Sequence, residues 1–157
     1  MTVFFDRTIG HNIPDACKLL DMRVEAHRDH FAHDAPDEVW LPVVAEKRWM
    51  VVTNDNRIRF NELELTALIE NRVGCVMLGS GSRTRREYMR ALLDAWSEIE
   101  RLEREEPRPF IYVLHADGRL ERRYPSSDPV APRRRRRWRR ERDARRDEGQ
   151  AEQSGVS

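Results

Sequence analysis

Short apolar runs alternate with helical patterns along most of the chain, and this alternation restricts the fold more than any other feature. Three runs have strong strand character, namely Val3–Phe5, Met50–Thr53 and Cys75–Leu78. A weaker extended segment spans residues 23–27. Strands separated by helices favour right-handed β-α-β units. We therefore predict an α/β fold with a mainly parallel sheet.

Four helices are expected between and after these strands. Residues typical of helix starts mark where they begin: Asn12, Pro36, Asn61 with Glu64, and Thr84 with Glu87. The residues expected to face the core are Ala16, Cys17, Leu19 and Leu20 in the first helix, Val39, Trp40, Val43 and Val44 in the second, Leu65, Leu68 and Ile69 in the third, and Tyr88, Leu92, Ala95, Trp96 and Ile99 in the fourth.

A β-hairpin and a change of composition mark the C-terminal part. Phe110–Leu114 and Arg119–Tyr124 flank an Ala-Asp-Gly turn at 116–118, which indicates an antiparallel edge of the sheet. Beyond the hairpin the composition turns to Pro, Ser and Asp and then to an arginine run, which cannot bury a core. We therefore predict one domain over residues 1–124 and a disordered Arg-rich tail over 125–157.

Charge is divided unevenly between these two parts. Residues 1–132 contain 19 basic and 23 acidic residues, whereas residues 133–157 contain 10 arginines and 5 acidic residues. An acidic body with a basic arm indicates a polyanionic partner for the arm. Trp138 inside the arginine run could stack on one base of an RNA strand. Solubility and docking of a protein partner are the competing explanations of the run.

The two cysteines, Cys17 and Cys75, are isolated and form neither a metal motif nor a disulfide framework. This usage favours packing in the core and a reducing compartment. No apolar stretch approaches the length of a membrane span, and the N-terminus lacks the pattern of a signal peptide. We therefore expect a cytoplasmic protein with no membrane partner.

Acidic residues follow two of the predicted strands. Asp6 ends the stretch TVFFD, Asp55 follows MVVTN, and Asp37 lies in the first turn of a predicted helix. Ligands of an open α/β sheet bind beyond the carboxyl ends of its strands, so the three acids could share one site. Two carboxylates about 4 Å apart repel by roughly 4 kcal/mol at an effective dielectric constant of about 20, which favours a bound cation. Oxygen ligands favour Mg²⁺ or Mn²⁺, and such an ion can activate water for phosphodiester hydrolysis.

Each acid also has a structural explanation. Asp37 in a first helical turn gains about 0.3–1 kcal/mol from the helix dipole. Asp55 within Asn-Asp-Asn could shape a turn. Taken singly, the structural role is favoured for each acid; taken together, the metal site is favoured.

The segments FFD at 4–6, DEVW at 37–40 and VVTND at 51–55 resemble the PIN-like nucleases, and most closely the PIN-like domains of VapC-type toxins. The resemblance covers residues 3–80 well and the rest of the body loosely. It implies a three-layer α/β/α fold and a Mg²⁺- or Mn²⁺-dependent ribonuclease. The catalytic residues that it implies are Asp6, Asp37 and Asp55 as metal ligands, with Thr53 beside the last acid. The further acid that the family usually carries on an early helix has no clear match here.

Arginines next to these acids are candidates for holding nucleic acid. Arg57 and Arg59 face the same way in an extended segment and lie just beyond Asp55. An arginine pair in that place can grip the phosphates of a bound strand. Pairing with nearby glutamates is the competing explanation. Arg7, which follows Asp6, is a third candidate.

The segment HRDHFAHDAP holds the densest group of imidazoles. His27, His30 and His33 are spaced by three residues, which suits one helix face and a zinc ion. The segment is more typical of a loop, so a dedicated zinc site is disfavoured. Asp29 is instead expected to support the acidic site.

Two functional hypotheses follow. The first is a metal-dependent ribonuclease of a toxin–antitoxin system, with RNA as substrate and a cognate antitoxin protein as partner; a homodimer is left open. The second is a non-catalytic nucleic-acid-binding module on a PIN-like scaffold, in which the arginine tail is the functional segment.

Overall fold

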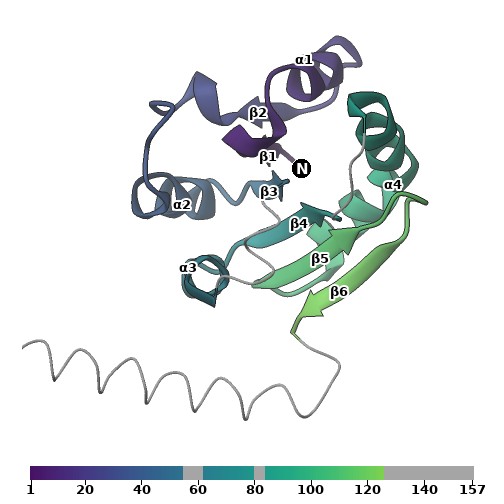
Figure 1. The fold of residues 1–157 in the computed structure, drawn as a ribbon. Coiled ribbons are helices and arrows are strands. Elements are labelled where there is room, and N and C mark those ends of the chain that lie inside the picture. Colours follow the sequence, from purple (N-terminus) through teal and green to yellow (C-terminus); the bar gives the residue numbers. More distant parts are fainter. Residues whose placement is uncertain (55–61, 80–83, 126–157) are drawn as a thin grey trace, which may run out of the picture. The chain divides into compact units, whose positions relative to one another are not determined.

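The computed structural model of the protein describes residues 1–54, 62–79 and 84–125. Its sheet has the strand order β2-β1-β3-β4-β5-β6, and all neighbouring strands are parallel except β5 and β6 (Figure 1). The strands are β1 (Val3–Phe5), β2 (Val24–Ala26), β3 (Met50–Thr53), β4 (Gly74–Leu78), β5 (Phe110–Leu114) and β6 (Leu120–Tyr124). The predicted α/β fold with a mainly parallel sheet and a C-terminal hairpin is confirmed.

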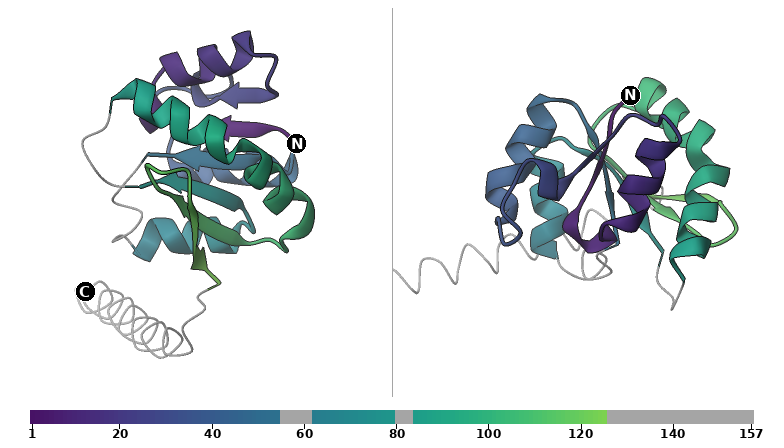
Figure 2. Two further views of the ribbon diagram at one scale, coloured as in Figure 1. Left: turned by 90° about the vertical axis from the view of Figure 1, so that its right-hand side faces the viewer. Right: turned by 90° about the horizontal axis from the view of Figure 1, so that it is seen from above.

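Helices cover both faces of the sheet. α1 (Asn12–Leu19) and α4 (Arg85–Glu105) lie on one face, and α2 (Asp37–Glu46) and α3 (Glu62–Glu70) lie on the other, as the view from above in Figure 2 shows. Two short 3₁₀ helices follow the first two strands: η1 (Arg7–Ile9) and η2 (His27–Asp29). Among the described residues, no helix combines the length and the apolar character that a membrane span needs.

β1, β3, β4 and β5 are buried on both faces, which explains why these strands read as continuous apolar runs. In β1, Val3 and Phe5 enter the apolar cluster under α1 and α4, whereas Phe4 enters the cluster under α2 and α3. The free thiols divide in the same way, with Cys17 in the first cluster and Cys75 in the second. Both cysteines are fully buried, as the core-packing prediction requires. Burial raises the pKa of the Cys17 thiol to about 11, so the thiol stays protonated near neutral pH.

The faces of the two shorter helices differ from the prediction. In α1 the buried residues are Ile13, Pro14 and Cys17, while Leu19 is 86% and Leu20 55% exposed. The helix ends at Leu19, and the last two leucines of the expected stripe lie at and just beyond this end and are exposed. Asn12 is the first helical residue, and the cap position before it makes no side-chain hydrogen bond.

In α2 the buried residues are Trp40, Leu41 and Val44. Val39 was expected in this stripe but is 52% exposed. Leu41 takes its place in the core and is 1% exposed. The buried stripe is therefore rotated by part of a turn relative to the predicted one.

The long helix α4 agrees better with its sequence pattern. The predicted capping box is present: the Thr84 hydroxyl accepts from the Glu87 N–H at 3.3 Å, and the Glu87 carboxylate accepts from the Thr84 N–H at 2.7 Å. Leu92, Ala95 and Ile99 are buried as predicted, and Tyr88 and Trp96 are partly buried against the same cluster. The capping box predicted from Asn61 and Glu64 lies outside the part described in side-chain detail.

The hairpin turn also follows the prediction. Gly118 has a φ of 82°, a conformation that favours glycine, and lies between β5 and β6. The second strand begins one residue later than expected, at Leu120. The predicted boundary between residues 124 and 125 stays a prediction, because residues 126–157 lie outside the described part.

Candidate active site

Asp6 follows the last residue of β1 and lies beside the end of β3, since the two strands are parallel neighbours. Its main-chain N–H donates to the Val52 carbonyl at 3.0 Å, which extends the strand pairing by one residue. The residue is only 8% exposed. A carboxylate buried to this extent requires hydrogen-bond donors or an opposite charge.

Three donors surround the Asp6 carboxylate. The Arg7 N–H donates to Oδ1 at 2.6 Å. The hydroxyls of Thr8 and Thr53 donate to Oδ2 at 2.8 and 2.9 Å. Thr8 also accepts from the Asn54 N–H at 3.0 Å, and its hydroxyl lies 3.2 Å from that of Thr53. The network joins the ends of β1 and β3 and fixes the direction in which the carboxylate points.

Thr8 is the residue of this network that the sequence reasoning missed. The signal was the spacing Asp-x-Thr directly after a strand, where a short hydroxyl side chain can reach back to the preceding residues. Thr53 was expected beside Asp55, and its hydroxyl reaches Asp6 on the neighbouring strand.

Asp37 is the first residue of α2, as predicted, and is half-buried. Its Oδ1 accepts from the Trp40 Nε1–H at 3.0 Å. The Trp40 ring in turn stacks on Phe4 of β1, with the ring centroids 5.4 Å apart. The Trp40 indole therefore connects the Asp37 carboxylate to β1, the strand that Asp6 follows.

His27 lies within electrostatic range of both acids. Burial lowers the pKa of His27 below its ordinary value and outweighs the negative charges of Asp6 and Asp37, which act to raise it. Arg7 and His33 lower the same pKa. The imidazole is thus neutral near pH 7.

Arg7 is exposed, but its guanidinium is fixed. Nη1 donates to the main-chain carbonyls of His33 at 3.1 Å and Ala35 at 2.9 Å. The side chain thus reaches from the end of β1 to the loop before α2, and it keeps a positive charge next to Asp6.

Asp55, Arg57 and Arg59 lie outside the described residues. The convergence of Asp6, Asp37 and Asp55 on one ion therefore stays a prediction, and so does the phosphate-binding role of the two arginines.

The described part offers oxygen donors at this edge of the sheet. The Asn54 Oδ1 is buried and has no hydrogen-bond partner among the described residues. Together with the oriented Asp6 carboxylate it is a donor of the kind that Mg²⁺ and Mn²⁺ prefer. Within residues 1–54, 62–79 and 84–125, no group of three or more His, Cys, Asp or Glu is placed to hold a metal. These ranges alone therefore do not supply a set of three such ligands.

The loop histidines point to different partners. His30 contacts Glu25 at 2.7 Å, while His27 packs among aromatic rings. Asp29, expected to support the acidic site, instead pairs with Lys18 at 2.7 Å. The hydrogen bond from Lys18 holds the pKa of Asp29 below its ordinary value. Asp29 therefore ties η2 to α1.

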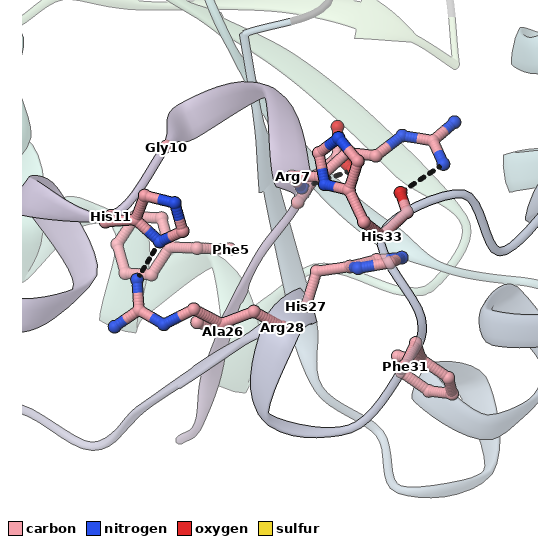
Figure 3. A pocket seen from close by; sticks show the side chains of 10 residues that line it. Phe5, Arg7, Gly10, His11, Ala26, His27, Arg28, Phe31 and His33 are labelled. Atoms are coloured by element: carbon pink, nitrogen blue, oxygen red, sulfur yellow. Dashed lines mark hydrogen bonds between the residues drawn. The ribbon is translucent and has the colours of Figure 1, made fainter.

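A pocket of about 290 Å³ opens beside Asp6 (Figure 3). Its walls come from the end of β1 with η1 and the turn before α1, and from the end of β2 with η2 and the loop after it. Phe5 and Phe31 supply apolar surface. The polar lining residues are Asp6, Arg7, His11, His27, Arg28 and His33.

Comparison with known protein families gives one match. Residues 1–80, just over half of the chain, match the family described as a PIN like domain. No curated protein and no solved structure matches the chain. The matched range contains β1 to β4 with Asp6, Asp37 and Thr53, and PIN-like domains are generally nucleases that use divalent metals. The chain therefore belongs to the PIN-like domain family and has a nuclease-type fold.

Proposed function

We propose that this protein is a metal-dependent ribonuclease of the VapC-type toxin class, which hydrolyses RNA phosphodiester bonds with Mg²⁺ or Mn²⁺. The observation that supports it most is the Asp6 carboxylate, buried at the carboxyl edge of a PIN-like sheet and oriented by three donors. An ionised carboxylate has about four lone-pair positions, so three donors leave room for a cation. Such a carboxylate is better explained as a ligand than as a surface charge.

The roles of the residues follow from their chemistry. The proposed metal ligands are Asp6, Asp37 and Asp55. Thr8 and Thr53 hold Asp6 in one orientation. A bound divalent cation would supply an activated water and would offset charge on the leaving oxygen. The residues proposed to hold the phosphates of the RNA strand are Arg7, Arg57 and Arg59.

The partners follow from the same assignment. The substrate is RNA, and the proposed protein partner is a cognate antitoxin in the cytoplasm. The Arg-rich tail supports binding of a polyanion, because arginines release counterions from a nucleic acid when they contact its phosphates. Size-exclusion chromatography of the purified chain would show whether it is a homodimer.

RNA cleavage by charge-neutral variants tests the function. We expect the wild-type chain to cleave single-stranded RNA with Mn²⁺ and to be inactive with EDTA. Asp6→Asn and Asp55→Asn should abolish cleavage while circular dichroism shows both variants folded. Asp94→Asn is the matched control, since Asp94 is an exposed acid on α4, and it should cleave as the wild type does. Metal-dependent cleavage at the wild-type rate in both Asp6→Asn and Asp55→Asn would end the catalytic assignment.

A further inference from the structure

His27 has a buried nitrogen that makes no hydrogen bond within the part of the chain that the structure describes. The residue is 2% exposed and packs against the rings of Phe31 and Trp40 at centroid distances of 5.4 and 6.0 Å. Its Nε2 has no hydrogen-bond partner among the described residues. Leaving such an atom without a hydrogen bond is unfavourable, whereas a phenylalanine would fill the same aromatic site without that cost. The nitrogen therefore needs a hydrogen-bond partner. The His27 ring lines the pocket beside Asp6.

The pocket also holds the positive charge of Arg7, which lies next to the Asp6 carboxylate. Arg7 makes no ion pair among the described residues, and Nη1 is the only part of its guanidinium that has partners there. Within residues 1–54, 62–79 and 84–125, Nε and Nη2 make no hydrogen bond and can donate to a ligand. Arg28 differs, because it pairs with Asp15 and contacts His11. Figure 3 shows the His11–Arg28 pair apart from Arg7 and His33.

We propose that this pocket binds a phosphate group of a nucleotide chain, with the Arg7 guanidinium and the His27 Nε2–H as its donors. The proposal rests on the proposed function only for the source of the phosphate, since binding itself requires no cleavage. The pocket volume of about 290 Å³ is on the order of ten water volumes, which accommodates a phosphate with part of its sugar.

Charge decides between ligand classes. A fixed guanidinium with further N–H groups matches the oxygens of a phosphate. A neutral base offers no negative charge to the guanidinium. A phosphate can accept from the Arg7 guanidinium and from the His27 Nε2, which has no hydrogen-bond partner among the described residues.

Binding of inorganic phosphate by the full chain in EDTA tests the inference. Isothermal titration should show that His27→Phe binds phosphate about tenfold more weakly than the wild type, because a hydrogen bond to a charged group is lost. His30→Phe is the matched control, since His30 is exposed, contacts Glu25 and does not line the pocket. It should bind as the wild type does. Every variant keeps the Arg-rich tail, so binding by the tail cancels in the comparison.

Two short RNAs identify the source of the phosphate. Tighter binding of a 5′-monophosphorylated dinucleotide than of its 5′-hydroxyl form assigns the pocket to a terminal phosphate. Equal binding of both, weakened alike by His27→Phe, assigns it to an internal phosphodiester. The inference is overturned if none of the three probes binds the wild-type chain, or if His27→Phe binds them all as tightly as the wild type.

A readout that needs no variant covers the case in which His27→Phe does not fold. In the wild-type chain with labelled histidines, inorganic phosphate should shift the NMR signals of the His27 ring, and unmoved signals at saturating phosphate contradict the proposal.

Because the binding experiments contain no metal, they also separate this inference from the proposed function. Phosphate binding through His27 without RNA cleavage keeps the inference and removes the ribonuclease, and cleavage without phosphate binding does the reverse.

Discussion

At the scale of single residues, the candidate site is built on one oriented carboxylate. Asp6 could be predicted from the sequence, because an acid directly after an apolar strand is a local pattern. The Asp-x-Thr spacing indicates a bond from Thr8 to Asp6, but the contacts of Thr8 with β3 could not be predicted, because they depend on how β1 and β3 are aligned. Phe5 pairs with Val52 in that register, and this brings Thr53 and Asn54 within reach of the Thr8 hydroxyl. A register between strands some 45 residues apart is not visible in the chain itself.

Substitution of Thr8 tests its positioning role. Thr8→Val keeps the side-chain shape but removes the hydroxyl, so Asp6 loses a donor and the Asn54 N–H loses its acceptor. We expect the free energy of unfolding to fall by about 1 kcal/mol in urea titrations. We also expect the kcat of RNA cleavage to fall with KM little changed, because only the carboxylate is misplaced.

Thr8→Ser is the control for this prediction, since it restores the hydroxyl. It should recover most of the lost kcat. A Thr8→Val variant that cleaves RNA as fast as the wild type would show that Thr8 has no part in positioning Asp6.

At the scale of elements, a long helical pattern in the sequence predicted the buried face of its helix better than a short one did. α4 has 21 residues, and its cap and most of its buried face follow the sequence. α1 has 8 residues, and its apolar residues fit two phases of a helix. In the structure the face with Ile13 and Cys17 is buried against the sheet, and Leu19 and Leu20 stay exposed. In so short a helix, contact with the sheet determines which face is buried, and the helical period of the sequence alone does not predict that face.

The start of α2 offers a matched pair of acids. Asp37 and Glu38 both lie in its first turn, where either gains from the helix dipole. Asp37→Asn keeps an acceptor for the Trp40 N–H, so the fold should persist. We expect Asp37→Asn to lose most RNA cleavage and Glu38→Gln to keep it, although each removes one charge from the same turn. Equal activity in the two variants would leave Asp37 with only a structural role.

At the scale of the whole molecule, the sheet joins the family-matched segment to the rest of the body. Residues 1–80 supply β1 to β4, and β5 then pairs with β4 while β6 closes the edge as a hairpin. This architecture was predictable, because continuous apolar runs alternating with helices leave few alternatives. The site was predictable only in part. Asp6 follows β1 and Asp37 opens α2, as the sequence indicated, and Thr53 contacts Asp6. The pocket beside Asp6, and the His27 Nε2 that has no hydrogen-bond partner among the described residues, depend on tertiary packing, which no local sequence pattern predicts.

The central claim is that Asp6 anchors a divalent cation, and thermal unfolding with and without Mn²⁺ tests it most directly. An ion that binds only the folded chain adds about 2.7 kcal/mol at 100 times its dissociation constant. The melting temperature of the wild-type chain should therefore rise by several degrees, and that of Asp6→Asn should stay where it is without metal. If the wild-type melting temperature does not move, or if both proteins shift equally, Asp6 is not a metal ligand. The non-catalytic nucleic-acid-binding module then becomes the better description.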